Sequence, residues 1–171
     1  WITTWNTRCG VATYASNLVA GGDPPAAILA AEADDRTFQD GPEVIRCWRQ
    51  GEGGALERLE AEIERLRLDV LVIQFQYSFF DFHAFAAFLL RQSAAGRGVI
   101  VMMHATVDAA ENPHKRLRFL ASALAACDRV LVHSIHDLNR LKKIGVERNT
   151  ALFPHGIMQP AVAPSQEAGA R

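Results

Sequence analysis

Histidines follow several apolar runs of this chain, at points where β-strands would end. His104 comes directly after Val99–Met103, and His155 and Gly156 follow the shorter run Ala151–Phe153. A neutral imidazole in such a position can exchange hydrogen bonds with a sugar hydroxyl or act as a base. The alternative is a histidine whose hydrogen bonds are satisfied by the backbone at a strand end.

A turn with a single glycine precedes the first expected helix. The turn reads Thr7-Arg8-Cys9-Gly10. A helix N-terminus presents unpaired N–H groups that can hold a phosphate, and Gly10 would let a ligand approach the backbone closely. The alternative is a plain tight turn. The motifs GxGxxG and GxxxxGK[ST] are both missing from the sequence, which disfavours a dinucleotide site and a P-loop.

Further polar and aromatic residues extend the candidate site. Gln74 and Gln76 lie at the end of a buried run, where their amides could contact sugar or peptide-like groups. Tyr77 could stack on a ring or close the core, and the core is favoured. Thr106, two residues after His104, could add a hydrogen bond or stabilise a turn.

Other conspicuous residues have simpler interpretations. Ser134 stands where its side chain would cap a following helix. His133 and His136 do not form a convincing metal-binding pair, so we expect no metal site there. We interpret a group of phenylalanines as core with an interface: Phe79, Phe80, Phe82, Phe85 and Phe88.

Composition places the chain among ordinary globular proteins. Its 171 residues suit one domain, and 49% of them are hydrophobic and 22% charged. The formal net charge of -1 gives no reason to expect a nucleic-acid partner. The three cysteines form no CxxC pair, and no apolar run reaches the roughly 18 residues of a membrane helix. We therefore expect a cytoplasmic protein.

Apolar runs alternate with helical patterns along the chain, which predicts an α/β fold with a three-layer, doubly wound parallel sheet. The expected strands are Ile2–Trp5, Pro25–Ala30, Val44–Trp48, Asp69–Phe75, Val99–Met103, Arg129–Val132 and Ala151–Phe153. The expected helices are Val11–Ala20, Leu56–Leu66, Phe82–Arg91, Pro113–Ala126 and Ile135–Ile144.

The two ends of the chain suggest one domain of a larger protein. The first residue is Trp1 rather than methionine, and a strand is expected almost at once. Residues 158–171 are rich in alanine and proline without an apolar period, which is typical of a linker or tail. We therefore expect a Rossmann-like domain over residues 1–157, followed by a linker toward a C-terminal domain.

Five segments together resemble the N-terminal domain of family-four-like, retaining glycosyltransferases with the GT-B architecture. The segments are Thr7–Tyr14, Ile73–Tyr77, Met103–Thr106, Cys127–Ser134 and Phe153–Ile157. The resemblance implies one half of a two-domain enzyme that moves a sugar from a nucleotide-sugar to a glycan or glycolipid acceptor. It implies no metal and no cofactor in this chain, and it allows a peripheral contact with the inner face of the membrane.

The resemblance also assigns roles to particular residues. It implies a catalytic contact of His104 with the transferred sugar or the acceptor. It places Arg8, Gly10, His155 and Gly156 along the donor-phosphate side of the cleft. The remaining expected contacts are to the acceptor, from Tyr14, Gln74, Gln76, Tyr77 and Thr106.

The chain also departs from the family. It lacks the C-terminal domain that carries the paired glutamates and the basic diphosphate-binding residues, so we expect it to be inactive alone. Its turn has one glycine where many relatives have two. Two alternatives stay open: a sugar-nucleotide epimerase of the same architecture, and a free-standing, non-catalytic module that binds sugar or protein.

Overall fold

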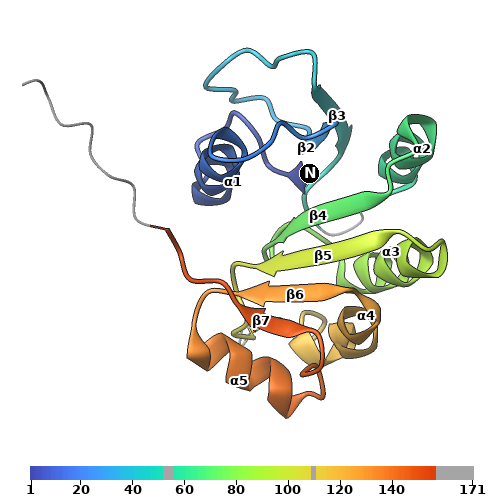
Figure 1. Cartoon of the computed structure of the whole chain (residues 1–171). Coiled ribbons are helices and arrows are strands. Elements are labelled where there is room, and N and C mark those ends of the chain that lie inside the picture. Colours follow the sequence, from blue (N-terminus) through green and yellow to red (C-terminus); the bar gives the residue numbers. More distant parts are fainter. Residues whose placement is uncertain (52–55, 109–110, 157–171) are drawn as a thin grey trace, which may run out of the picture.

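The computed structural model describes residues 1–51, 56–108 and 111–156, and these form an α/β fold around one parallel sheet. Its seven strands lie in the order β3-β2-β1-β4-β5-β6-β7 (Figure 1). Their bounds are β1 Ile2–Thr3, β2 Ile28–Ala31, β3 Val44–Trp48, β4 Val70–Phe75, β5 Gly98–Met103, β6 Arg129–Val132 and β7 Thr150–Leu152. The expected doubly wound parallel fold is confirmed, while the expected linker at 158–171 lies outside the described residues.

Helices cover both faces of the sheet, which gives the expected three layers (Figure 1). Ala15 of α1 packs with Ile28 and Ala30, whereas Leu29 of the same strand joins the larger cluster that contains Ile63 of α2. Because alternate strand residues face opposite sides, α1 and α2 cover opposite faces. The helices are α1 Gly10–Ala20, α2 Glu57–Leu66, α3 Phe82–Ala94, α4 Ala121–Ala126 and α5 Ile135–Lys143, with a 3₁₀ turn at Leu117–Leu120.

Side-chain caps fix where two of these helices begin. The Asp81 carboxylate accepts a hydrogen bond from the backbone N–H of Ala84 at the start of α3. Ser134 does the same for Asp137 N at the start of α5, as its sequence position predicts. Such a cap satisfies one of the N–H groups that a helix start leaves without a partner.

Several expected elements differ in extent: β1 is shorter than expected, α3 is longer, and two others begin later for a clear physical reason. Residues 113–116 are not helical, because the side chain of Asn112 accepts from His114 N, and the first helical turn begins only at Leu117. Such an Asn turn competes with helix formation. Residues 25–27 are not part of β2, which starts at Ile28 after two prolines that cannot donate to a neighbouring strand.

The strand order reverses between β1 and β4. From β1 the chain moves outward to β2 and β3, and it then returns to β4 and moves the other way to β7. In open parallel sheets, ligands bind in the crevice beyond the carboxyl ends of the strands at such a reversal. We therefore expect a ligand site at the loops that follow β1, β4 and β5.

Candidate functional site

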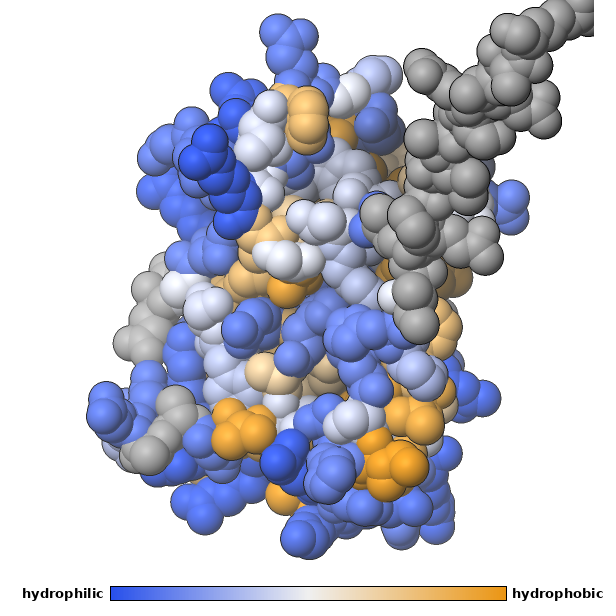
Figure 2. All heavy atoms as spheres, turned by 90° about the vertical axis from the view of Figure 1, so that its left-hand side faces the viewer, coloured by the Kyte–Doolittle hydropathy of each residue, from blue (hydrophilic) through white to orange (hydrophobic). Residues whose placement is uncertain are grey.

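A cavity of about 780 Å³ lies at the reversal point, beyond the carboxyl ends of the strands. It is lined by Cys9, Gly10, Val11, Thr13, Tyr14, Asn17, Gln50, Gln76, Ser78, Phe79, His104, His155 and Gly156. Figure 2 faces this edge of the molecule, where hydrophilic and intermediate residues prevail and hydrophobic ones occur in small groups. We call this hollow the central cavity.

Six of the residues predicted from the sequence meet in the central cavity, although they come from distant segments. They are Gly10, Tyr14, Gln76, His104, His155 and Gly156. Four others do not line it: Arg8, Gln74, Tyr77 and Thr106. Of these four, Gln74 supports the site from behind by its contact with His104.

His104 is held in the cavity wall by the strand beside it. Its backbone N–H donates to Phe75 O over 2.9 Å, and its Nε2 lies 2.5 Å from Gln74 Oε1. Gln74 is completely buried, so it acts behind His104 rather than in the cavity. A carboxamide oxygen only accepts hydrogen bonds, so Nε2 carries the proton and Nδ1 is left as an acceptor.

The environment of His104 keeps its ring neutral. Burial, together with the nearby rings of His133 and His155, lowers its pKa from 6.5 to about 4. At neutral pH the ring therefore carries no charge and is a weak base. It is suited to accepting a hydrogen bond from a hydroxyl group.

His104 belongs to a group of four rings, the histidine–tyrosine cluster, made of Tyr14, His104, His133 and His155. The rings of His133 and His155 stack with centroids 3.8 Å apart, and Tyr14 meets the three imidazoles edge-on at 5.0 to 5.3 Å. The cluster joins α1, β5, β6 and the segment after β7, and so closes one side of the central cavity.

Two polar atoms of this cluster are buried without a partner among the described residues. His133 Nδ1 lies 2.8 Å from the Phe153 carbonyl oxygen, so Nδ1 carries the proton and Nε2 is an acceptor. That Nε2 and the Tyr14 hydroxyl have no hydrogen bond. Buried polar groups are rarely left unpaired, so the two atoms indicate a place for a bound polar group.

Sequence reasoning gave His133 no role. The signal was present, because His133 follows β6 as His104 follows β5, and Met103 pairs with Val132 in the sheet register. Residues that follow paired positions of adjacent parallel strands lie side by side at the same edge.

The start of α1 forms another part of the cavity wall. Cys9 precedes the helix without a side-chain cap, and a Cβ added to Gly10 would meet nothing within 4 Å. The φ angle of Gly10 is not positive, so its backbone conformation is open to any residue. Because a helix leaves its first N–H groups without partners inside the helix, a helix start at this wall suits an anion.

Tyr77 and Thr106 support loops outside the cavity. Tyr77 is buried and donates to Asp108 Oδ1 over 3.0 Å, and burial together with that carboxylate raises its pKa. The Thr106 hydroxyl, also buried, bonds to the Asp137 carboxylate of α5. Arg8 is exposed and lies against a neighbouring hollow beside the β2–β3 loop.

The phenylalanines after β4 form core. Phe79, Phe80, Phe82, Phe85 and Phe88 are all at most 3% exposed. Within the described residues, no group of three His, Cys, Asp or Glu side chains is arranged to hold a metal ion. The same residues include no helix that is both long and apolar enough to span a bilayer.

The central cavity offers neutral hydrogen-bonding groups rather than charges. Amides come from Asn17, Gln50 and Gln76, hydroxyls from Thr13 and Ser78, and imidazoles from the histidine–tyrosine cluster. This set suits a ligand with many hydroxyl groups, each of which donates and accepts. Comparison of the chain with known family models, curated proteins and solved structures finds no match.

Proposed function

We propose that this chain is the acceptor-binding half of a retaining glycosyltransferase that moves a sugar from a nucleotide-sugar to a glycan or glycolipid. Support comes from convergence: four of the five segments that resemble the family contribute residues to the lining of the central cavity. The fifth, Cys127–Ser134, supplies His133 to the histidine–tyrosine cluster. The cavity also lies at the reversal of strand order, where ligands of such folds bind.

The observation that carries the proposal is the state of His104. Gln74 fixes its tautomer, and burial keeps it neutral, so an acceptor nitrogen is available at a polar cavity. In the proposed role, Nδ1 accepts a hydrogen bond from a sugar hydroxyl and so orients the sugar. Orientation of this kind can supply a large part of a transfer rate.

The uncapped start of α1 supplies the donor side of the proposal. Its N–H groups and the open space over Gly10 suit the diphosphate of a nucleotide-sugar. His155 and Gly156 border the same cavity from the opposite end of the chain. The residues that would hold the nucleotide itself belong to the partner domain in this proposal.

Sugar binding by the chain itself tests the proposal. We expect sugars to shift NMR signals of the cavity residues, and His104→Ala to weaken binding about tenfold, because one hydrogen bond contributes roughly 0.5–1.5 kcal/mol. His136→Ala, on the exposed side of α5, is the matched control and should bind normally. We also expect no turnover of nucleotide-sugars. Equal binding by both variants, or robust turnover by the chain alone, would overturn the proposal.

A further inference from the structure

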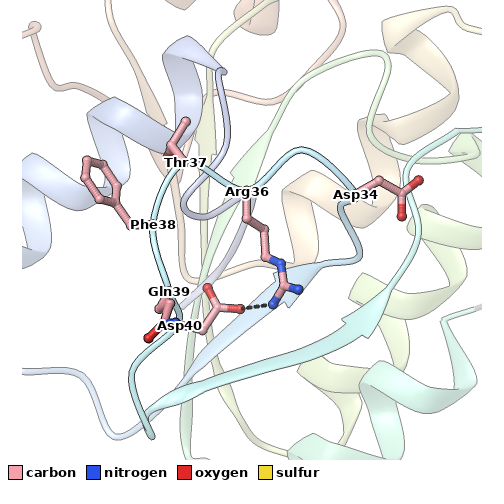
Figure 3. Close-up of a pocket in the computed structure, with 6 residues that line it drawn as sticks. All are labelled: Asp34, Arg36, Thr37, Phe38, Gln39 and Asp40. Carbon is pink, nitrogen blue, oxygen red and sulfur yellow. Dashed lines mark ion pairs between the residues drawn. The ribbon is translucent and has the colours of Figure 1, made fainter.

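The central cavity continues into a series of hollows along the β2–β3 loop. It shares Cys9 and Gln50 with the first hollow, which in turn shares Arg8 and Asp35 with the second. The third hollow lies within the loop itself and is drawn in Figure 3. We call the first two, beside the cavity, the outer groove. The shared lining residues place it next to the central cavity.

Hydrogen bonds fix the loop that forms this groove. The Thr37 N–H donates to Asn6 O over 2.7 Å, and Thr7 and Arg36 form an antiparallel bridge. Behind the loop, Arg46 of β3 donates to Asp40 through Nε over 2.7 Å, and both side chains are only 15% exposed. A groove held in this way needs little ordering when a ligand binds.

Two of the charges that line the third hollow are paired with each other. Arg36 and Asp40 lie 3.8 Å apart (Figure 3). Arg46 also forms an ion pair with Asp40. The guanidinium of Arg46 holds the pKa of Asp40 below its usual range. This part of the loop is therefore a scaffold, and the groups free to bind lie closer to the central cavity.

The outer groove presents a positively charged and a negatively charged side chain that are not paired. Arg8 and Asp35 line both of its hollows, and neither forms a hydrogen bond or ion pair with another described residue. The Gln50 amide and the Thr7 hydroxyl add donors and acceptors. A polyanion would meet the Asp35 carboxylate, and an acyl chain would cover the charged groups of Arg8 and Asp35 without pairing them. Neutral sugar units satisfy both kinds of group.

We infer that the acceptor is a neutral oligosaccharide rather than a single sugar, with its further units lying along the outer groove over Arg8 and Asp35. This inference rests on the proposed function, because it extends the acceptor from the central cavity. It gives Arg8 a place on the acceptor side instead of the donor-phosphate side.

The test compares ligand lengths. The chain is first applied to an array of linear neutral oligosaccharides of one to six units and of their acidic counterparts. For each series of oligosaccharides that binds, the affinities are then measured by calorimetry. We expect the affinity to rise with the number of sugar units. In the double variant Arg8→Ala/Asp35→Ala, the affinity for the longer oligosaccharides should fall about tenfold, which removes most of that rise. Arg148→Ala with Asp23→Ala, at exposed positions elsewhere, is the matched control.

The outcomes separate the two proposals. Sugar binding that requires His104 but does not depend on length, or that the Arg8 and Asp35 variant leaves unchanged, would overturn the oligosaccharide inference and keep the proposed function. Selective binding of acidic chains would also overturn it. The absence of binding to every saccharide would remove the proposed function and this inference together.

Discussion

Two groups of rings in this molecule differ in what surrounds them. The phenylalanine cluster stacks Phe80 on Phe85 at 4.4 Å and on Trp48 at 4.9 Å, and every one of these side chains is at most 2% exposed. The histidine–tyrosine cluster is as closely packed, yet it borders a cavity and keeps buried polar atoms without partners. Close packing alone therefore does not distinguish core from site, whereas a group of buried polar atoms without partners beside a cavity favours a site.

The largest expected effect is on the phenylalanine cluster. Phe85→Ala should lower the free energy of unfolding by about 3–5 kcal/mol, because it removes a fully buried ring and leaves a cavity. Chemical denaturation measures this loss. Phe38→Ala removes a ring that is 73% exposed and should change stability by at most about 0.5 kcal/mol. Similar effects of the two changes would contradict the assignment of the core.

The histidine–tyrosine cluster should make stability depend on pH. His104 takes up a proton near pH 6.5 when unfolded, but only near pH 4 when folded. Between these values the unfolded state binds more protons, so the free energy of unfolding falls as the pH falls from 6.5 to 4. Burial lowers the pKa of His133 in the same direction. Denaturation curves across this range, with and without His104→Asn, measure the effect, and an unchanged slope would contradict it.

Gln74→Leu tests whether a buried residue controls the site. The change removes the acceptor that fixes Nε2–H of His104. It also removes the Gln74 Nε2, which has no partner. Stability should therefore change little. Nitrogen chemical shifts should show a mixture of His104 tautomers, and sugar affinity should fall by several fold. Leu is close to Gln in size, so a retained single tautomer would assign Gln74 to packing only.

The sequence predicts the sheet more completely than it predicts the candidate site. Continuous apolar runs such as Val99–Met103 predict buried strands, because both faces of a parallel sheet are covered. Gln76, His104 and His155 could be found from their positions after strands, whereas Tyr14, on α1, followed only from the family resemblance. Gln74 was misplaced because the sequence does not tell which face its side chain takes. The loop around Asp35 has no motif, and its role depends on pairing with Asn6 and Thr7, which only the folded chain brings near.

The smallest expected effects come from removing the hydroxyl groups of two tyrosines, and the two changes should affect stability differently. Tyr14→Phe keeps a ring in the histidine–tyrosine cluster and removes a buried hydroxyl that has no partner, so stability should stay equal or rise slightly. Tyr77→Phe removes a hydroxyl that donates to Asp108, and it should cost about 1 kcal/mol. If the Tyr14 hydroxyl is reserved for a ligand, only Tyr14→Phe should weaken sugar binding, by several fold. Thermal unfolding and sugar titration of both variants measure the contrast. A Tyr14→Phe protein that is less stable and binds sugar normally would place Tyr14 with the core rings.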